Sequence, residues 1–360
     1  MKRLDSEALE EIALGATVLG TGGGGDPTLG KLMAQQAVAR HGTIELVPLD
    51  AVSDDDWIIP TAMMGAPTVM VEKIPGGGEV VDAFRMLEQR LGCRAFATLS
   101  IEAGGINSMI PMVVAATLGM PIVDADGMCR AFPEIQMVTP TLYGVSATPM
   151  ALADEKGNRT LLETPDNFWT ERISRAVTVQ MGGSASIALY AMKGATAKKA
   201  LIPGSLSLER SIGQTLLACR RQKRDPIDSL LSLLHGRRLA VGKVTDVRRR
   251  TERGFARGEV EIAGTQRDAG AQCRIFFQNE NLVFWKNGQP QATVPDLITV
   301  VDEQTGLPIT TELLKYGLRV TVIAIPCHEK WRSPQALELV GPRYFGYDID
   351  YVPLEPAAVN

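Results

Sequence analysis

Three carboxylates stand beside glycines in the first half of the chain, a setting that suits acid–base catalysis. Glu102 lies in SIEAGGIN, and Asp124 and Asp126 lie in PIVDADG. A positioned carboxylate can take a proton from water, while nearby backbone N–H groups stabilise the negative charge that develops on a substrate. We therefore predict that Glu102, Asp124 and Asp126 include the catalytic base.

Each of these residues also has a structural interpretation. Glu102 and Asn107 could cap a helix that begins near residue 107, because asparagine is a favoured N-cap residue. Asp124 and Asp126 could accept hydrogen bonds within Asx turns. Their Asp-x-Asp spacing could bind a divalent cation, but only with further oxygen ligands from elsewhere in the chain. We predict that no metal ion and no cofactor takes part.

Four consecutive glycines in VLGTGGGGDP, residues 18–27, raise the question of what this loop holds. Glycines let backbone N–H groups converge on a ligand without obstruction by Cβ atoms. The helix expected to begin at Asp26-Pro27 directs its positive dipole end back toward the loop. A small anionic or carbonyl-bearing ligand is predicted to contact Gly22, Gly23, Gly24, Gly25 and Asp26.

The alternative for this loop is a tight turn packed against other backbone. The two interpretations differ in how they tolerate side chains. A loop that serves ligand contact should accept valine at Gly23 or Gly24 with little loss of the fold, and should lose ligand binding instead.

The glycine loop does not fit a nucleotide-binding motif. Gly25 to Lys31 has the G-x-x-x-x-G-K spacing of a P-loop, but Leu32 occupies the position of the serine or threonine that ligates magnesium. The segment before the glycines has helical spacing, whereas the P-loop and the dinucleotide-binding fingerprint both follow a strand. The sequence therefore argues against a nucleotide ligand.

Hydrophobic periodicity divides the chain into two parts. Residues 8–19 and 27–41 have helical spacing, with Ser6 as the first N-cap, and strand-like and helical runs then alternate. This alternation predicts an α/β domain with a mainly parallel sheet over residues 1–165. Composition changes near TPDNFWT, and residues 166–360 are predicted to form a helical segment and a mainly-β, barrel- or sandwich-like domain that carries some helices.

The ends of the predicted parallel strands suggest further ligand contacts, because ligands bind beyond the carboxyl ends of such strands. One strand ends in MMGAP, and another ends in SIEAGGIN. We add Gly65, Asn107 and Glu134 to the predicted substrate-binding residues. The basic run RRRTERGFAR, residues 248–257, is interpreted as a solvated hairpin turn.

Composition excludes several classes of protein. The 360-residue chain has a formal net charge of −4, which argues against a nucleic-acid partner. No signal peptide is recognisable at the N-terminus, and the most apolar stretches are too short to span a bilayer. Five scattered cysteines suit a reducing compartment and have no zinc-binding spacing. We predict a cytoplasmic protein without a membrane partner, and a homo-oligomer by analogy with many metabolic enzymes.

Distinctive motifs occur along nearly the whole chain: LGTGGGGDP, GAPTVMVEKIPGG, EAGGIN, PIVDADGMCRAFPEIQM, MGGS, PDLITVVDEQTGLPITTELLKYG and LELVGPRYFGYDIDYVPL. This series resembles one bacterial family, the S-methyl-thiohydantoin desulfurases, whose members are often associated with hydantoinase and oxoprolinase proteins. Cys129 stands where we expect a small residue such as glycine. The resemblance implies an N-terminal α/β domain and a β-rich C-terminal domain.

The activity implied by this resemblance is hydrolysis of a five-membered cyclic amide or thiohydantoin ring. Water would replace the S-methyl group and give hydantoin and methanethiol, with a carboxylate as the base. The alternative is a non-catalytic binding or regulatory subunit that works with a hydantoinase- or oxoprolinase-type hydrolase.

The C-terminal part is expected to close over the crevice of the α/β domain and to exclude bulk water from it. Arg343 and Tyr347 follow the strand-like LELV and a Gly-Pro turn. An arginine and a tyrosine could bind ring carbonyls and cover apolar ring faces, so we predict both as substrate-binding residues. A surface hairpin with ordinary aromatic packing is the alternative.

Overall fold

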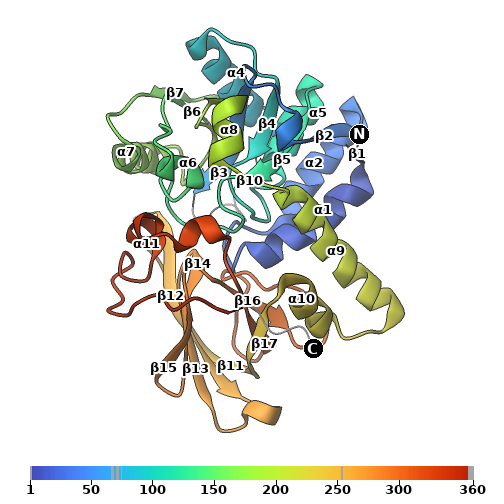
Figure 1. Ribbon diagram of the computed structural model, residues 1–360, viewed down its shortest axis with the longest axis vertical. Coiled ribbons are helices and arrows are strands. Elements are labelled where there is room, and N and C mark those ends of the chain that lie inside the picture. Colours follow the sequence, from blue (N-terminus) through green and yellow to red (C-terminus); the bar gives the residue numbers. More distant parts are fainter. Residues whose placement is uncertain (1, 66–68, 70–72, 74, 253, 356–360) are drawn as a thin grey trace.

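Two sheets organise the chain, as seen in a computed structural model that describes residues 2–65, 69, 73, 75–252 and 254–355 (Figure 1). The upper domain in Figure 1 is α/β, and the long strands of the second sheet form the lower domain. The first sheet has the order β1-β2-β5-β4-β3-β8-β6-β7, with β9 beside β3 and β10 beside β5. Its strands are β1 (Lys2–Leu4), β2 (Ile44–Pro48), β3 (Trp57–Gly65), β4 (Ala97–Ser100), β5 (Ile122–Asp126), β6 (Met150–Ala153), β7 (Arg159–Leu162), β8 (Ser184–Ala188), β9 (Met192–Lys193) and β10 (Ile202–Pro203).

The predicted α/β class is confirmed, with a sheet that is mixed rather than mainly parallel. Strands β2, β5, β4 and β3 are parallel neighbours, as the alternation of strands and helices predicts. β8 pairs antiparallel with β3, and β6 then pairs antiparallel with β8. β6 and β7 form a hairpin across the turn at Asp154–Asn158, and strands joined so tightly have to be antiparallel.

The described residues form helices around this sheet, at the junction with the second domain and within that domain. They are α1 (Ser6–Leu19), α2 (Pro27–His41), α4 (Glu79–Leu91), α5 (Ile110–Leu118), α6 (Thr139–Leu142), α7 (Asn167–Gln180), α8 (Gly194–Ala200), α9 (Ser205–Gln222), α10 (Pro226–Leu234) and α11 (Pro334–Val340), with three short 3₁₀ turns η1 (Leu49–Ala51), η2 (Gln266–Asp268) and η3 (Glu329–Arg332). Asp5, one residue before the predicted Ser6, caps α1 by accepting a hydrogen bond from Ala8 N at 2.9 Å. None of the described helices is both long enough and apolar enough to cross a membrane.

The second sheet is antiparallel and curls toward closure. Its order is β15-β14-β13-β12-β11-β17-β16. Its strands are β11 (Arg237–Glu252), β12 (Phe255–Gly264), β13 (Gln272–Gln278), β14 (Glu280–Lys286), β15 (Gln289–Thr293), β16 (Leu297–Asp302) and β17 (Arg319–Ile325). Asn281 Nδ2 of β14 donates to Ile298 O of β16 at 2.9 Å, which joins strands that are far apart in the sheet order. The predicted mainly-β domain with some helices is thus confirmed.

Two local predictions in this domain have different outcomes. The basic run 248–257 forms the predicted hairpin, since Arg248 pairs with Glu259 and Glu252 with Phe255, although Arg253 lies outside the described residues. LELV is not a strand but the end of α11. Ser333 accepts a hydrogen bond from Ala336 N, and Pro334 occupies the first helical turn, so these two residues start a helix.

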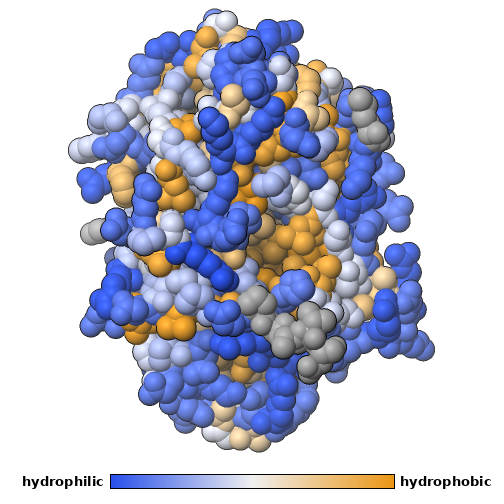
Figure 2. Space-filling view, in the orientation of Figure 1, coloured by the Kyte–Doolittle hydropathy of each residue, from blue (hydrophilic) through white to orange (hydrophobic). Residues whose placement is uncertain are grey.

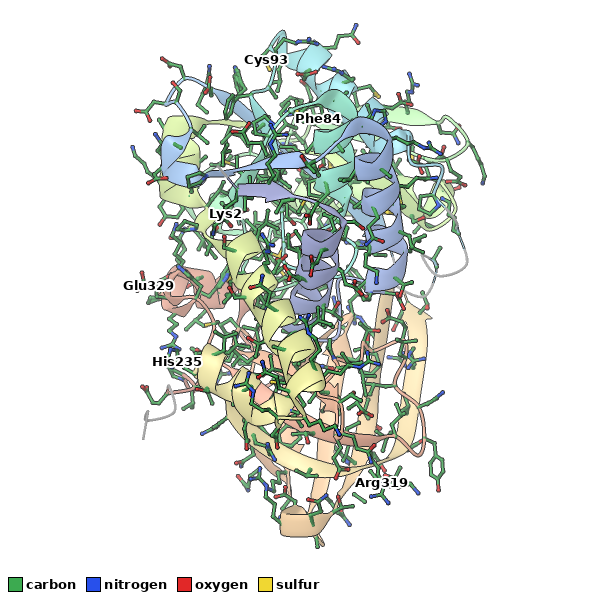
Figure 3. All side chains as sticks on the ribbon, turned by 90° about the vertical axis from the view of Figure 1, so that its right-hand side faces the viewer. Lys2, Phe84, Cys93, His235, Arg319 and Glu329 are labelled. Carbon is green, nitrogen blue, oxygen red and sulfur yellow. The ribbon has the colours of Figure 1, made fainter. Side chains whose placement is uncertain are left out.

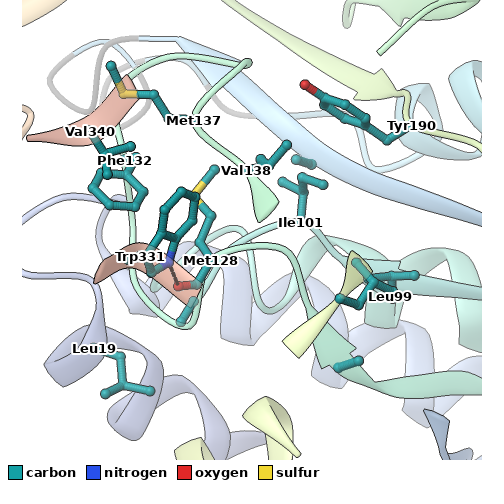
Figure 4. Close-up of a cluster of buried hydrophobic side chains, with 14 of the residues drawn as sticks. Leu19, Leu99, Ile101, Met128, Phe132, Met137, Val138, Tyr190, Trp331 and Val340 are labelled. Carbon is teal, nitrogen blue, oxygen red and sulfur yellow. Dashed lines mark hydrogen bonds between the residues drawn. The ribbon is translucent and has the colours of Figure 1, made fainter. Parts of the chain in front are cut away.

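The two sheets share one apolar core. Trp331, fully buried, packs among Met128, Phe132 and Val138, and its Nε1 donates to Met128 O at 2.8 Å (Figure 4). Apolar side chains also gather in a hollow at mid-height of the face drawn in Figure 2, where the domains meet. Because β8, β9 and β10 belong to the first sheet, a boundary after residue 165 cuts through that sheet.

Away from this junction, each domain is filled by its own side chains. Phe84 of α4 is fully buried in the α/β domain, whereas Arg319 lies near the far end of the β domain (Figure 3). Cys93 lies near the upper end in the same view, and none of the five cysteines forms a disulfide. The described residues contain no group of three or more His, Cys, Asp or Glu side chains arranged to hold a metal ion.

Candidate functional site

The glycine loop lies between α1 and α2 and packs against the loop that follows β4. Ile106 N donates to Gly24 O at 2.8 Å. Gly24 has φ +72°, and a Cβ atom at Gly24 would lie 2.5 Å from Gly104 Cα. A Cβ atom at Gly105 would lie 2.4 Å from Gly25 O. The two glycine-bearing loops therefore touch through their backbones, and the expectation that Gly24 tolerates valine is wrong.

The second domain also binds the glycine loop, through backbone hydrogen bonds. Asn281 N donates to Thr21 O and Thr311 N donates to Gly22 O, both at 2.8 Å. Thr21 has φ +51°, an uncommon conformation for a β-branched residue. Gly23 leaves space for a side chain of the second domain, because a Cβ atom there would lie 1.9 Å from Glu280 Oε1. The loop is thus an interdomain contact as well as a turn.

A cavity of about 80 Å³ lies where these loops meet the end of β3. Its apolar lining includes Met63, Met64, Ile101, Met128, Phe132, Ile135, Val138, Ile187 and Leu189, with Gly24, Gly25 and Gly65 at the backbone. Its polar side chains are Glu102, Asn107, Glu134, Arg175, Asn279 and Glu280. The last two come from the second domain, so both domains line the cavity.

Glu102 is a buried carboxylate in this cavity, with 6% of its surface exposed. Its Oε1 accepts a hydrogen bond from Asn107 Nδ2 at 2.6 Å, and its Oε2 accepts one from Phe132 N at 3.4 Å. Burial raises the pKa of Glu102 to about 7, against the opposing effects of these hydrogen bonds and of the Arg130 charge. A carboxyl group that titrates near neutrality is suited to general base catalysis.

Glu280 is a second buried carboxyl group in the cavity and was missed by the sequence analysis. Only 2% of its surface is exposed, and its Oε2 has no hydrogen-bond partner among the described residues. Burial, together with the charge of Glu102, raises the pKa of Glu280, whereas the charge of Arg130 opposes this rise. Glu280 begins β14 within FQNENLVFW, so the only signal in the sequence is an acidic residue next to an apolar strand.

Arg130 supplies a buried positive charge that acts on the cavity residues Glu102 and Glu280. Its guanidinium donates to Thr21 Oγ1 at 3.2 Å and to Pro295 O and Asp296 O, and it lies 4.1 Å from the centroid of the Phe132 ring. Burial lowers the pKa of Arg130 to about 10, so the group remains charged at neutral pH. This cation links the glycine loop, the cavity wall and the second domain.

Asn107, Glu134 and Gly65 all line the cavity, as ligand contacts would. Asn107 does not cap α5, which begins at Ile110; its Oδ1 accepts from Met63 N at 2.8 Å, and its Nδ2 also lies 3.2 Å from Met63 O. It therefore ties Glu102 to the end of β3. Glu134 Oε2 accepts from Tyr344 Oη of the C-terminal segment at 2.7 Å. Their predicted roles in substrate binding stay predictions.

Asp124 and Asp126 are not among the residues that line the cavity. Asp124 accepts hydrogen bonds from Ser207 N at 3.0 Å and Ser207 Oγ at 2.5 Å, at the start of α9. Asp126 Oδ1 accepts from Met128 N at 3.1 Å and Cys129 N at 2.7 Å, the pattern of the Asx-turn alternative. Burial raises the pKa of Asp126 to about 8.

Gly22, Gly23 and Asp26, which were also predicted as ligand contacts, are not among the residues that line the cavity. Asp26 caps α2 by accepting from Thr28 N at 2.6 Å, with Pro27 in the first turn as predicted. Gly22 and Gly23 face Asn281 and Glu280 of the second domain and are absent from the cavity lining, unlike Gly24 and Gly25.

Arg343 and Tyr347 lie outside the cavity lining as well. Arg343, with 59% of its side chain exposed, pairs with Asp348 and Asp350. The Tyr347 ring packs 6.0 Å from the Phe276 ring on the second sheet. The second domain instead lines the cavity with Asn279 and Glu280, in a turn and strand that the sequence analysis did not single out.

Comparisons with known proteins match nearly the whole chain to one family. The model for the S-Me-THD-like N-terminal domain matches residues 7–164, and the model for the S-Me-THD-like C-terminal domain matches residues 165–354. An X-ray crystal structure of a protein from Chromobacterium violaceum has a TM-score of 0.81 and 24% identity, and the match covers 99% of this chain and 100% of that one. It shows the same fold. No curated protein matches the chain.

Proposed function

The chain belongs to the S-Me-THD-like family, and from this premise we propose that it is a hydrolase that replaces the S-methyl group of a thiohydantoin ring with the oxygen of water. The products would be hydantoin and methanethiol. The observation that carries the proposal is Glu102, a buried carboxylate with a pKa of about 7 that lines a small apolar cavity.

In this proposal Glu102 is the general base. It takes a proton from water while the water oxygen attacks the ring carbon that carries sulfur. The amide of Asn107 and the backbone N–H of Phe132 hold the carboxylate in one orientation on the cavity wall. A base that titrates near the working pH combines a useful fraction of carboxylate with a useful proton affinity.

The cavity walls suit the proposed substrate. Met63, Met64, Met128 and Phe132 offer the soft, polarisable contacts that a methylthio group prefers. The volume of about 80 Å³ is well below the roughly 300–1,000 Å³ of pockets for drug-sized ligands, which favours a small ring. The buried cation of Arg130 stabilises negative charge in the cavity.

The test is thiol release from S-methyl-thiohydantoin by the full chain, followed with a thiol dye. Glu102→Gln is expected to lower turnover by roughly 10²–10⁴-fold and to leave the protein folded. Glu312→Gln is the matched control, because Glu312 is a half-buried glutamate of raised pKa that lies outside the cavity lining. Wild-type turnover in Glu102→Gln would remove the base from the proposal. A folded wild-type protein that binds hydantoin without releasing thiol would favour the regulatory-subunit alternative.

A further inference from the structure

We infer that Glu280 is the general acid that protonates the departing sulfur, so that the second domain supplies one of two catalytic carboxyl groups. This inference rests on the proposed hydrolysis and deepens it. It assigns a chemical role to a residue that neither the sequence motifs nor the predicted site residues include.

The position of Glu280 is the first support. It begins β14 and lines the cavity together with Glu102, although the two residues lie in different domains. The Glu280 carboxyl group reaches Gly23 so closely that a Cβ atom there would be 1.9 Å from Oε1 and 2.5 Å from Cδ. The absence of a side chain at Gly23 is therefore what allows this carboxyl group to enter the glycine loop.

The protonation state of Glu280 is the second support. A buried carboxylate oxygen without a hydrogen-bond donor is costly, and Glu280 Oε2 accepts no hydrogen bond from any described residue. Glu102, in contrast, accepts two hydrogen bonds that favour its charged form. Two carboxyl groups that line one small cavity do not both ionise readily, and the one with more hydrogen-bond donors carries the charge. Glu280 is thus the group that keeps its proton.

The reaction balances with these two groups. Glu102 takes one proton of water as the O–C bond forms, and the electron pair of the C=N bond moves to the ring nitrogen. Glu102 then gives that proton to the ring nitrogen. The C–S bond breaks with its electron pair on sulfur, and the proton of Glu280 completes methanethiol. The second proton of the former water returns to Glu280 as the carbonyl forms, so both carboxyl groups end as they began.

If Glu280 protonates the departing sulfur, the rate of thiol release depends little on the acidity of the leaving thiol. The experiment therefore compares S-methyl-thiohydantoin with its S-(2,2,2-trifluoroethyl) analogue, whose more acidic thiol leaves without protonation. Glu280→Gln is expected to lower kcat for the S-methyl compound by roughly 10²–10⁴-fold and for the trifluoroethyl compound by about tenfold or less. Glu102→Gln should slow both compounds alike, and Glu312→Gln should slow neither.

A second variant covers the case in which Glu280→Gln does not fold. Gly23→Ala keeps the carboxyl group but displaces it from the loop, so it should show the same selective loss on the S-methyl compound. A decrease that is equal for both compounds, or no decrease for either, would overturn the role of Glu280 while leaving the hydrolysis intact. A wild-type protein that releases no thiol from either compound would overturn the proposed function and the acid with it.

Discussion

The two domains build the cavity in different ways. The α/β domain contributes two glycine-bearing loops, at Gly22–Gly25 and Gly104–Gly105, whose backbones touch and which lie at helix and strand ends. The β domain contributes Glu280 from the beginning of a strand, between Asn279 and Asn281 and ahead of the apolar run LVFW. Glycine-rich loops that line a site can be recognised in the sequence. A single side chain such as Glu280 becomes part of the site only when the two domains dock, so the sequence does not reveal it.

The largest expected effect is at Arg130, whose buried guanidinium donates hydrogen bonds to both domains. Replacing it tests whether the two domains depend on each other. Arg130→Met leaves the acceptors Thr21 Oγ1, Pro295 O and Asp296 O without their donor and removes the cation near Glu102 and Glu280. We expect a loss of about 3–5 kcal/mol in the free energy of unfolding, measured by urea denaturation. Arg343→Met, which removes exposed ion pairs, should cost about 1 kcal/mol or less. Equal losses would mean that the interdomain cation does not hold the domains together.

The backbone contact of the glycine loops is tested at Gly24. Gly24→Ala should destabilise the protein by about 2–5 kcal/mol, the sum of left-handed strain and overpacking against Gly104. Gly119→Ala is the matched control, since Gly119 has φ +65° and a Cβ atom there would have no described residue within 4 Å, so only left-handed strain remains. Thermal unfolding of both variants separates the two contributions. If Gly24→Ala is no more destabilising than Gly119→Ala, the loops do not need close contact.

The buried carboxylate of Glu102 is expected to lower the free energy of unfolding at neutral and higher pH. Its pKa rises from an ordinary value of 4.5 to about 7 on folding, so between these values the folded state binds more protons than the unfolded state. Glu102 therefore has no effect on the free energy of unfolding below pH 4.5. Its contribution lowers the free energy of unfolding as the pH rises from 4.5, and the loss is largest above pH 7. Glu102→Gln should raise the free energy of unfolding at pH 8 by up to about 3 kcal/mol, and by little near pH 4.

The measurement is urea denaturation of wild-type protein and Glu102→Gln from pH 4 to 8. A difference between the two proteins that does not change with pH would contradict the burial of a titrating carboxyl group at this position.

The smallest expected effect concerns Tyr344, where the C-terminal segment meets the cavity wall. Tyr344→Phe removes the hydrogen bond from its hydroxyl to Glu134 Oε2 and should cost about 1–2 kcal/mol in thermal unfolding. Tyr347→Phe is the control, because its contact with Phe276 is through the ring. A larger loss from Tyr347→Phe would indicate that the segment is anchored away from the cavity.

Much of the α/β domain could be predicted from local patterns. The periodicity of EVVDAFRMLEQRL predicts α4, and the apolar runs IELVP and WIIPTAMMG predict β2 and β3. The antiparallel pairing of β8 with β3 could not be predicted in this way, because strand partners are chosen by tertiary packing. The strand predicted at LELV was wrong because Ser333 and Pro334, which precede these four residues, start a helix that continues through them.

The same division holds within the site. Glu102, Asn107 and Gly65 lie at ends of strands or in the loop that follows one, and such positions are visible in the sequence. Glu280 becomes a cavity residue only because Asn281 and Thr311 bind the glycine loop and bring β14 against it. The spacing of residues within a single segment of the sequence gives no information about how the two domains dock.

The most direct test of the account is a crystal structure of the full chain with bound hydantoin, the proposed product. We predict that the ring lies in the cavity, with the carbonyl carbon that replaces the C–S carbon about 3–3.5 Å from carboxyl oxygens of Glu102 and Glu280, or one water molecule away. A ring bound elsewhere, for example in the groove lined by Arg248, Arg257 and Phe276 on the second sheet, would contradict the claim that both domains build one active site.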